Sequence, residues 1–443
     1  MRKANIPVVK RELLFPFIII TSLFALWGIA NDLTNPMVSA FKKVMPELSN
    51  VQASLVQFAF YFGYFFMAFP AALFIRKYSY KSGIILGLSF YAIGAFLFYP
   101  AAANAEFNYF LISLWIITCG LAFLETTSNP LILSLGDKET ATQRLNLAQA
   151  FNPVGSLMGM IVAQQFVISA LRSDDKDASG VLIYDTLSDT AKAAVRDNDL
   201  SVISIPYIIL GLVVLAIMVI IIFTKIPKTS QEDKMSLSDS FKKLLANKNY
   251  KLGVVSQAFY VGAQIMCWTY IFQYVDNINE GLPATAHLTA TWFNVAAMII
   301  FLTGRWIGTG LMKTINPSKI LMLFGFGSVV FCAGAILING AIGLYSLVAV
   351  SLFMSIMFPT IYGIALKNMG DEAKIGSAGL VMAIVGGALM PVLQGSILDW
   401  GGSGFSDLQI LGFIPEVNFS FILPLICLAV VTTYGYITWK SSK

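Results

Sequence analysis

Residues 14–41 read LFPFIIITSLFALWGIANDLTNPMVSAF, and this run is long enough to cross a lipid bilayer as a helix. A membrane-spanning helix needs about 20 predominantly apolar residues. Asp32 lies roughly in the middle of the run, close to Asn31, Asn35 and Pro36. A charged side chain at the centre of a spanning helix costs about 2.5–3.5 kcal/mol on insertion scales. The polar cluster therefore requires a functional or structural reason.

Eleven further apolar runs follow the first one, and together they predict the fold class. Of the 443 residues, 57% are hydrophobic and 12% are charged, whereas soluble proteins carry about 25% charged residues. Open sheets are excluded, because their edges would leave backbone groups unpaired in lipid. We expect an all-α polytopic membrane protein with twelve transmembrane helices. The expected spans are 14–41, 51–75, 83–103, 107–136, 145–171, 202–224, 252–275, 288–312, 318–338, 341–366, 375–399 and 417–439.

The distribution of basic residues predicts the orientation of these spans. Twenty-two Lys and Arg residues fall in the termini and the even-numbered loops, and six fall in the odd-numbered loops. The positive-inside rule then places both termini in the cytoplasm, so that the protein lies in the cytoplasmic (inner) membrane. The basic amino terminus continues into the first span as a retained helix rather than a signal peptide. The net charge of +5 is therefore no sign of nucleic-acid binding.

Two polar stretches, 172–201 and 225–251, interrupt the apolar pattern. The second is basic, lies at the middle of the chain, and contains a candidate surface helix near 236–246. We expect an N-terminal six-helix bundle at 1–224, a cytoplasmic linker at 225–251 and a C-terminal six-helix bundle at 252–443. Two similar halves are typical of transporters with a substrate site near the middle of the bilayer.

The sequence contains no pattern typical of an enzyme or a metal site. The four cysteines lie inside spans without the spacing of metal ligands, and we interpret them as small buried hydrophobic residues. No Ser/His/Asp set and no phosphate-binding loop accompanies them. We therefore expect neither enzymatic activity nor a cofactor or metal.

Glu125 is the strongest candidate for a functional carboxylate. It lies in the stretch GLAFLETTSNPLIL, with Asn129 four residues later on the same helical face and Pro130 next to it. Burial disfavours the charged form of a carboxylate, so such a residue can bind a proton on one side of the membrane and release it on the other. An ionised carboxylate can also accept hydrogen bonds from sugar hydroxyls.

Amide and aromatic side chains recur at helical spacing in three other spans. Asp32 and Asn35 share a face of the first span, where Asn31 and Trp27 are also candidates. In the fifth span the amides are Asn146, Gln149 and Asn152, and in the seventh the stripe is Gln257, Tyr260, Gln264 and Trp268. Amides donate and accept at once, which suits pairs of hydroxyl groups, although Trp and Tyr also form interfacial belts.

Arg305 is the one basic residue placed inside a span. Three interpretations are open: it pairs with a carboxylate, it contacts the substrate, or its side chain extends to the cytoplasmic edge. His287, the single histidine, is expected in a loop rather than in a proton relay.

The chain resembles the major facilitator superfamily, specifically the fucose permease branch of the fucose–galactose–glucose:proton symporters. The motifs are FALWGIANDLTNP, VQFAFYFGYFFMAFPAALFIRKYSYKSGI, GLAFLETTSNP, RLNLAQAFNPVGS, AFYVGAQIMCWTYIFQY, GRWIGTGL and MSIMFPTIYGIALKNMG, and they extend over nearly the whole chain. The resemblance implies two six-helix bundles, alternating access and proton-driven sugar uptake. It implies that Glu125 is the coupling carboxylate and that Gln149, Trp27 and Trp268 match functional positions.

The first span departs from the family pattern NNLND, because this chain has NDLTN at residues 31–35. Asn35 stands at the aspartate position of the family, and Asp32 stands where the family has asparagine. Asp32 could therefore act as a second coupling carboxylate from a shifted position. Sodium coupling also remains open, because carboxylate and amide oxygens suit a hard cation.

These observations predict a monomeric importer of a monosaccharide, with L-fucose favoured and protons as the coupling ion. The alternatives within transporters are another hexose or an N-acetylhexosamine, sodium coupling, or drug efflux. A non-transporting membrane sugar receptor and a membrane enzyme are the alternatives from other classes.

Overall fold

The computed structural model describes residues 6–34, 37–45, 48, 50–175, 182–226, 236–400 and 408–442. The chain packs into two compact units, and each is described by itself. Unit 1 comprises Met1–Lys10, Ile132–Ala150 and Glu232–Lys443, and unit 2 comprises Arg11–Leu131 and Phe151–Gln231. Residues 132–150 are expected in the N-terminal bundle from the sequence, and here they pack with the helices of the C-terminal half.

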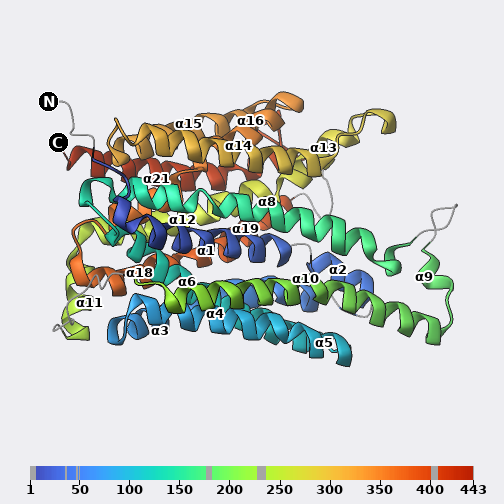
Figure 1. Cartoon of the computed structure of the whole chain (residues 1–443). Coiled ribbons are helices and arrows are strands. Elements are labelled where there is room, and N and C mark those ends of the chain that lie inside the picture. The colour runs from blue at the N-terminus through green and yellow to red at the C-terminus, as the bar shows by residue number, and fades with distance from the viewer. Residues whose placement is uncertain are drawn as a thin grey trace. The chain divides into compact units, whose positions relative to one another are not determined.

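Both units are built almost entirely from helices (Figure 1). The helices of unit 2 are α1 (Leu14–Thr34), α2 (Met37–Val44), α3 (Asn50–Lys77), α4 (Tyr80–Phe96), α5 (Phe98–Asn104), α6 (Phe107–Ser134, whose last residues enter unit 1), α8 (Asn152–Val162), α9 (Ile183–Thr186) and α10 (Asp189–Phe223). The segment Ala163–Val167 continues α8 as a π-helix.

Unit 1 contains the remaining helices and one small hairpin (Figure 1). They are α7 (Ala141–Gln149), α11 (Leu237–Ala246), α12 (Lys248–Thr269), α13 (Ile271–Glu280), α14 (Ala290–Leu311), α15 (Pro317–Leu337), α16 (Ala341–Met354), α17 (Met357–Ala365), α18 (Ala373–Met382), α19 (Gly386–Leu398), β1 (Gln409–Ile410), β2 (Ile414–Pro415), α20 (Glu416–Ser420) and α21 (Ile422–Lys440). Short 3-10 turns lie at Arg11–Leu13, Lys138–Thr140, Ile168–Ala170, Arg172–Asp174, Ala284–Ala286, Gly370–Glu372 and Ala383–Val385.

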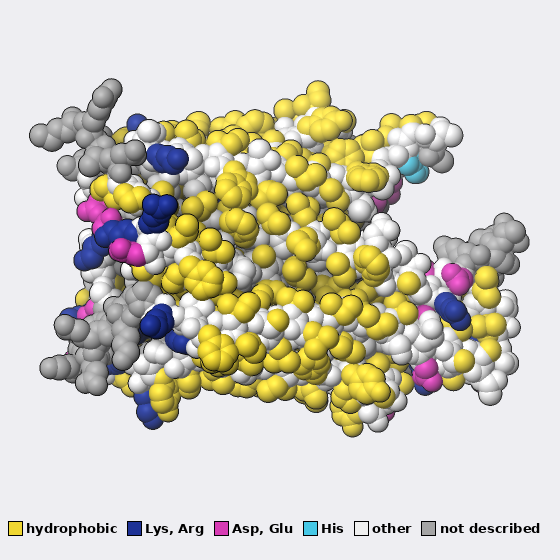
Figure 2. All heavy atoms as spheres, viewed as in Figure 1, with side chains coloured by type: hydrophobic (Ala, Val, Ile, Leu, Met, Phe, Trp, Pro, Cys, Tyr) yellow, Lys and Arg dark blue, Asp and Glu magenta, His cyan; other side chains and the backbone are white. Residues whose placement is uncertain are grey.

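Eleven helical stretches in the described part of the chain are long and apolar enough to cross a membrane. The remaining expected span, 252–275, corresponds to α12 and the start of α13. α12 has 22 residues, but Lys251, Gln257 and Gln264 make it more polar than the others. Apolar side chains cover the middle of the helices in view, and charged side chains lie toward the helix ends (Figure 2).

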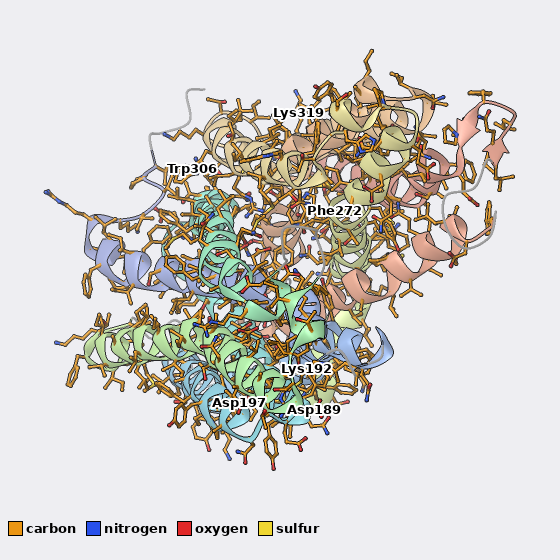
Figure 3. All side chains as sticks on the ribbon, turned by 90° about the vertical axis from the view of Figure 1, so that its right-hand side faces the viewer. Asp189, Lys192, Asp197, Phe272, Trp306 and Lys319 are labelled. Atoms are coloured by element: carbon orange, nitrogen blue, oxygen red, sulfur yellow. The ribbon has the colours of Figure 1, made fainter. Side chains whose placement is uncertain are left out.

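One boundary differs from the sequence expectation, and one expected helix is confirmed. Of the run 14–41, the structure describes α1 up to Thr34 and α2 from Met37. The polar stretch 172–201 is partly helical, because α10 begins at Asp189 and carries Lys192 and Asp197 beyond its apolar part (Figure 3). The surface helix expected near 236–246 is confirmed as α11.

Within unit 2, α1 and α8 pack closely because small residues face one another. A side chain at Gly28 would collide with the Asn152 carbonyl oxygen, and one at Gly155 with the Ala25 carbonyl oxygen. A Cβ at Gly159 would lie 2.6 Å from the Ile29 carbonyl oxygen. Small residues let helix backbones approach where lipid supplies no hydrophobic driving force, so this contact fixes α8 against α1.

We predict that Gly155→Ala lowers the melting temperature of the protein purified in detergent, because the added methyl must separate α1 from α8. Overpacking of this kind costs about 1–3 kcal/mol. Gly310→Ala in α14 is the matched control, since a Cβ there meets nothing within 4 Å. Equal melting temperatures for the two variants would contradict the proposed close contact.

Candidate functional site

Glu125 lies in α6 and is 6% exposed, so its carboxylate is buried as the sequence predicts. The Asn129 side chain lies one turn later in the same helix and interacts with it. Thr126 and Ser128 are fully buried, and their hydroxyl groups have no partner among the described residues. This part of unit 2 is therefore a buried polar segment in an apolar helix, where one carboxylate can exchange a proton.

Two tyrosines of unit 2 interact electrostatically with Glu125 or Asp32, and the sequence analysis did not single them out. Tyr61 and Tyr64 are three residues apart on α3 and share a face. Tyr61 interacts electrostatically with Asp32, and Tyr64 interacts with both Tyr61 and Glu125. The spacing within FYFGYFF was the available signal, but aromatic residues that pack between helices have the same spacing.

Asp32 lies close to Thr34, the last described residue of α1, and the chain is described again from Met37, where α2 begins. Asn31 lies beside it, and its side-chain oxygen is buried without a partner among the described residues. Asn35 and the kink expected at Pro36 fall outside the described residues.

Trp27 lies one turn before this cluster and is buried. Its ring centroid is 4.2 Å from that of Phe24 in the same helix. The structure therefore brings Trp27, Asn31 and Asp32 together along α1, and it connects Asp32 with Glu125 through α3.

The continuous amide face predicted for the fifth span is wrong. α7 ends at Gln149 and α8 begins at Asn152, with Pro153 in its first turn, so the helix is interrupted between the two amides. Asn152 donates to the Phe24 carbonyl at 3.3 Å in unit 2. Asn146 donates to Thr360 Oγ1 at 3.1 Å in unit 1. Spacing alone could not reveal this interruption.

Arg305 occupies the interior of unit 1 and is 3% exposed, so the cytoplasmic-edge interpretation is wrong. Its Nε donates to the Ser355 carbonyl, where α16 has just ended. Its Nη1 donates to the carbonyl of Gln149, the last residue of α7, at 3.0 Å. The guanidinium also lies 4.8 Å from the centre of the Phe301 ring. Arg305 therefore binds the carbonyl ends of two interrupted helices.

The stripe predicted on the seventh span is present on α12. Trp268 donates its indole N–H to Ser351 Oγ at 3.2 Å, and its ring packs edge-on against Phe301 at 5.1 Å. Tyr260 is fully buried, and Gln264 is half-buried. Trp268 is thus fixed by α14 and α16. The more deeply buried Tyr260 lies nearer the start of α12.

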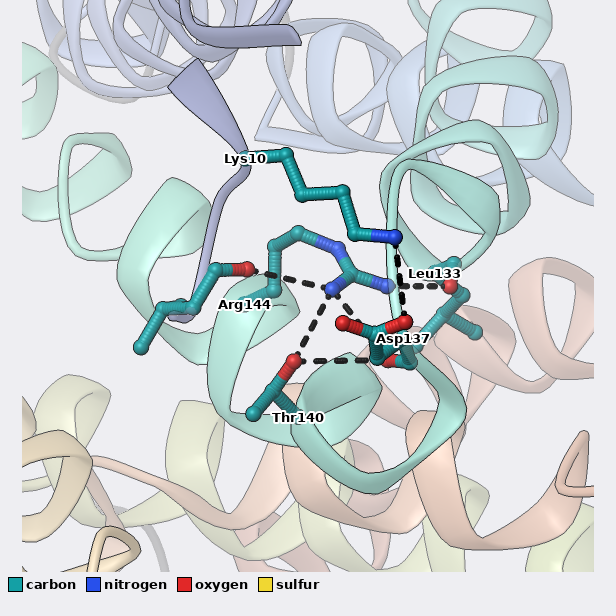
Figure 4. Close-up of polar contacts among 6 residues, drawn as sticks. Lys10, Leu133, Asp137, Thr140 and Arg144 are labelled. Carbon is teal, nitrogen blue, oxygen red and sulfur yellow. Dashed lines mark hydrogen bonds and ion pairs between the residues drawn. The ribbon is translucent and has the colours of Figure 1, made fainter. Parts of the chain in front are cut away.

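A second buried arginine in unit 1, Arg144, was assigned to a cytoplasmic loop from the sequence. Arg144 is 0% exposed and donates to the carbonyls of Ile132 at 2.7 Å and Leu133 at 2.6 Å, which end α6 (Figure 4). It also donates to Thr140 Oγ1 at 3.2 Å. Next to it, Lys10 forms an ion pair with Asp137 at 3.2 Å (Figure 4). These contacts hold α7 against the end of α6.

The chemistry available is proton binding and neutral hydrogen bonding. Among the described residues, no group of three or more His, Cys, Asp or Glu side chains could hold a metal ion. His287 is exposed in a loop, with its Nε2 3.1 Å from the Leu282 carbonyl oxygen. Both units supply amide, phenol and indole groups, and the candidate carboxylates Glu125 and Asp32 lie in unit 2.

Comparison with known proteins assigns a family to this arrangement. The model described as Major Facilitator Superfamily matches residues 14–393. The chain is 52% identical over 441 residues to the L-fucose-proton symporter of Haemophilus influenzae, covering 99% of this chain and 100% of that protein. It is 34% identical over 431 residues to the L-fucose-proton symporter of Escherichia coli, covering 96% and 93%.

A solved structure agrees over the same length. It is a variant of the Escherichia coli fucose:proton symporter, FucP, with a TM-score of 0.83 and 32% identity, covering 97% of this chain and 99% of that one. The expected all-α membrane fold with twelve helices is therefore confirmed.

We predict that Arg305→Lys lowers the melting temperature, because a single ammonium group cannot reproduce the planar fork that binds two carbonyls. A buried carbonyl left without a partner costs about 1–3 kcal/mol. Arg196→Lys is the control, because the Arg196 side chain is 37% exposed. A melting temperature of Arg305→Lys equal to that of the control would show that the two carbonyl contacts do not stabilise unit 1.

Proposed function

Since the chain belongs to the Major Facilitator Superfamily, we propose that it is a secondary transporter that imports L-fucose together with protons. The observation that carries this proposal is the 52% identity, over nearly the whole chain, to a protein named L-fucose-proton symporter. The protein is a multi-pass membrane transporter rather than an enzyme. We place it in the cytoplasmic membrane with both termini in the cytoplasm, because of the asymmetry of the basic residues. We also propose that it is a monomer.

The coupling mechanism starts from Glu125. In the outward-facing state its buried carboxylate takes up a proton, because burial favours the neutral form. Protonation removes the charge of Glu125 and weakens its interaction with the neighbouring Asn129 amide. Deprotonation of Glu125 toward the cytoplasm restores its charge and its interaction with Asn129, and it promotes release of the sugar. Asp32 is a second proton site, connected to the first by Tyr61 and Tyr64.

The proposed substrate-binding residues are those that the sequence analysis indicates, and they are of two kinds. Residues that contact the sugar directly are proposed to be Trp27, Asn31, Asn35, Asn129, Gln149, Tyr260, Gln264 and Trp268. Asn146, Asn152 and Arg305 complete the proposed set, and their hydrogen bonds in this structure are made with protein groups. The six-helix bundles at 1–224 and 252–443, joined by the linker 225–251, would alternate access to this site.

Two alternatives keep specific support. Sodium coupling is supported by the oxygen ligands that Asp32 and Asn31 offer at the end of α1. Another hexose or an N-acetylhexosamine is supported by the neutral amide groups, which suit any sugar hydroxyl. We propose no cofactor, no metal and no nucleic-acid partner, and we rank a sugar receptor below a carrier because the Glu125 carboxylate is buried in unit 2.

We predict that Glu125→Gln abolishes uptake of labelled L-fucose driven by a pH gradient in proteoliposomes, while counterflow of L-fucose survives. The amide has the shape of the protonated carboxyl group but cannot release a proton, so exchange continues without coupling. Glu106→Gln is the control, because Glu106 precedes the same helix and is exposed.

The same preparation tests the alternatives. Accumulation driven only by a sodium gradient would overturn the proton assignment and favour a cation site at Asp32. Loss of counterflow in Glu125→Gln would contradict a coupling role and indicate direct sugar binding. Absence of L-fucose transport by the wild type would overturn the substrate assignment.

A further inference from the structure

Gln257 in α12 is unusual among the buried polar residues of the described chain. Its side chain is 0% exposed, and neither its Nε2 nor its Oε1 has a hydrogen-bond partner there. It is the one described residue for which two buried side-chain atoms lack a partner. A buried amide without hydrogen bonds is strongly destabilising, whereas leucine or methionine would fill the same space at no such cost.

Tyr260 repeats the observation one turn later. It is also 0% exposed, and its hydroxyl group has no partner among the described residues. The i, i+3 spacing places Gln257 and Tyr260 on one face of α12. The Tyr260 ring lies 6.3 Å from the ring of Phe358, so this face lies against α17. The two residues thus form one unsatisfied polar surface on one side of a helix.

Other buried amides in unit 1 have protein partners. Gln394 is equally buried, and its Nε2 donates to Ser420 Oγ at 3.0 Å. Asn418 donates to the Tyr274 hydroxyl at 2.9 Å. Gln394 lacks a partner for its Oε1 alone, whereas Gln257 lacks a partner for both of its amide atoms.

The charge next to this surface limits what can bind there. Arg305 interacts electrostatically with Tyr260, and its guanidinium is already engaged by the Ser355 and Gln149 carbonyls. A cation would be repelled by this guanidinium. One amide donor, one amide acceptor and one phenol together match neighbouring hydroxyl groups of a neutral polyol, each of which donates and accepts.

We propose that Gln257 and Tyr260 bind hydroxyl groups of the transported sugar and decide which sugar is accepted. The inference rests on the proposed function and adds Gln257 as a specificity-determining residue. A site whose polar groups are satisfied only by the correct hydroxyl rejects analogues that lack it, because the protein groups are then left unpaired. Phe358 closes the surface with an aromatic ring suited to the C–H face of a sugar.

The test is competition against labelled L-fucose counterflow in proteoliposomes, using L-fucose and its four analogues that each lack one ring hydroxyl. We expect Gln257→Leu to weaken the apparent affinity for L-fucose about 10- to 100-fold. For one or two analogues, those that lack the hydroxyls bound by Gln257, the variant and the wild type should bind equally. Tyr260→Phe should give a smaller loss that disappears for its own deoxy analogue.

Gln394→Leu is the matched control, because it removes a buried glutamine that has a protein partner. It should weaken L-fucose and all four analogues by the same factor or leave them unchanged. Wild-type affinity of Gln257→Leu for L-fucose, or an equal loss for L-fucose and every analogue, would overturn the inference. These outcomes require L-fucose counterflow by the wild type, and its absence would instead contradict the proposed function.

Discussion

Backbone groups cannot be left unpaired inside a membrane, and Arg305 is the residue through which unit 1 meets this constraint. α7 ends at Gln149 and α16 ends just before Ser355, so both helices leave carbonyl groups free within the unit. One guanidinium binds both carbonyls. Interrupted helices are tolerated at membrane depth only where protein satisfies the freed groups. This contact therefore helps to hold α7 beside α14 and α17.

The need to pair backbone carbonyls at helix ends also explains Arg144. It binds carbonyls in the last turn of α6 and so holds α7 from its other end. The segment 132–150 is thus fixed in unit 1 by two arginines and by the Asn146 contact to Thr360. A short segment bound by a few directional hydrogen bonds can change partners at modest cost, whereas α1 and α8 are fixed by backbone contact over several turns. A carrier that alternates its access needs both kinds of contact.

Function depends on polar groups that the fold leaves incompletely satisfied. Glu125 has one amide neighbour in an apolar helix, and Gln257 and Tyr260 have no partner among the described residues. A protein selected only for stability would replace these groups by apolar ones. Glu125 lies in unit 2, and Gln257 and Tyr260 lie in unit 1, so each unit contains buried polar groups of this kind.

The sequence by itself determined the membrane class, the positions of most helices and the burial of Glu125, because these follow from apolar run length and from the cost of charge in lipid. It also indicated the amide stripe on α12, because that stripe is local. Only the tertiary structure decided that span 5 breaks before Asn152 and that Arg305 binds the carbonyls of Ser355 and Gln149. Helix ends and the partners of buried groups depend on contacts between distant segments, and residue spacing carries no record of them.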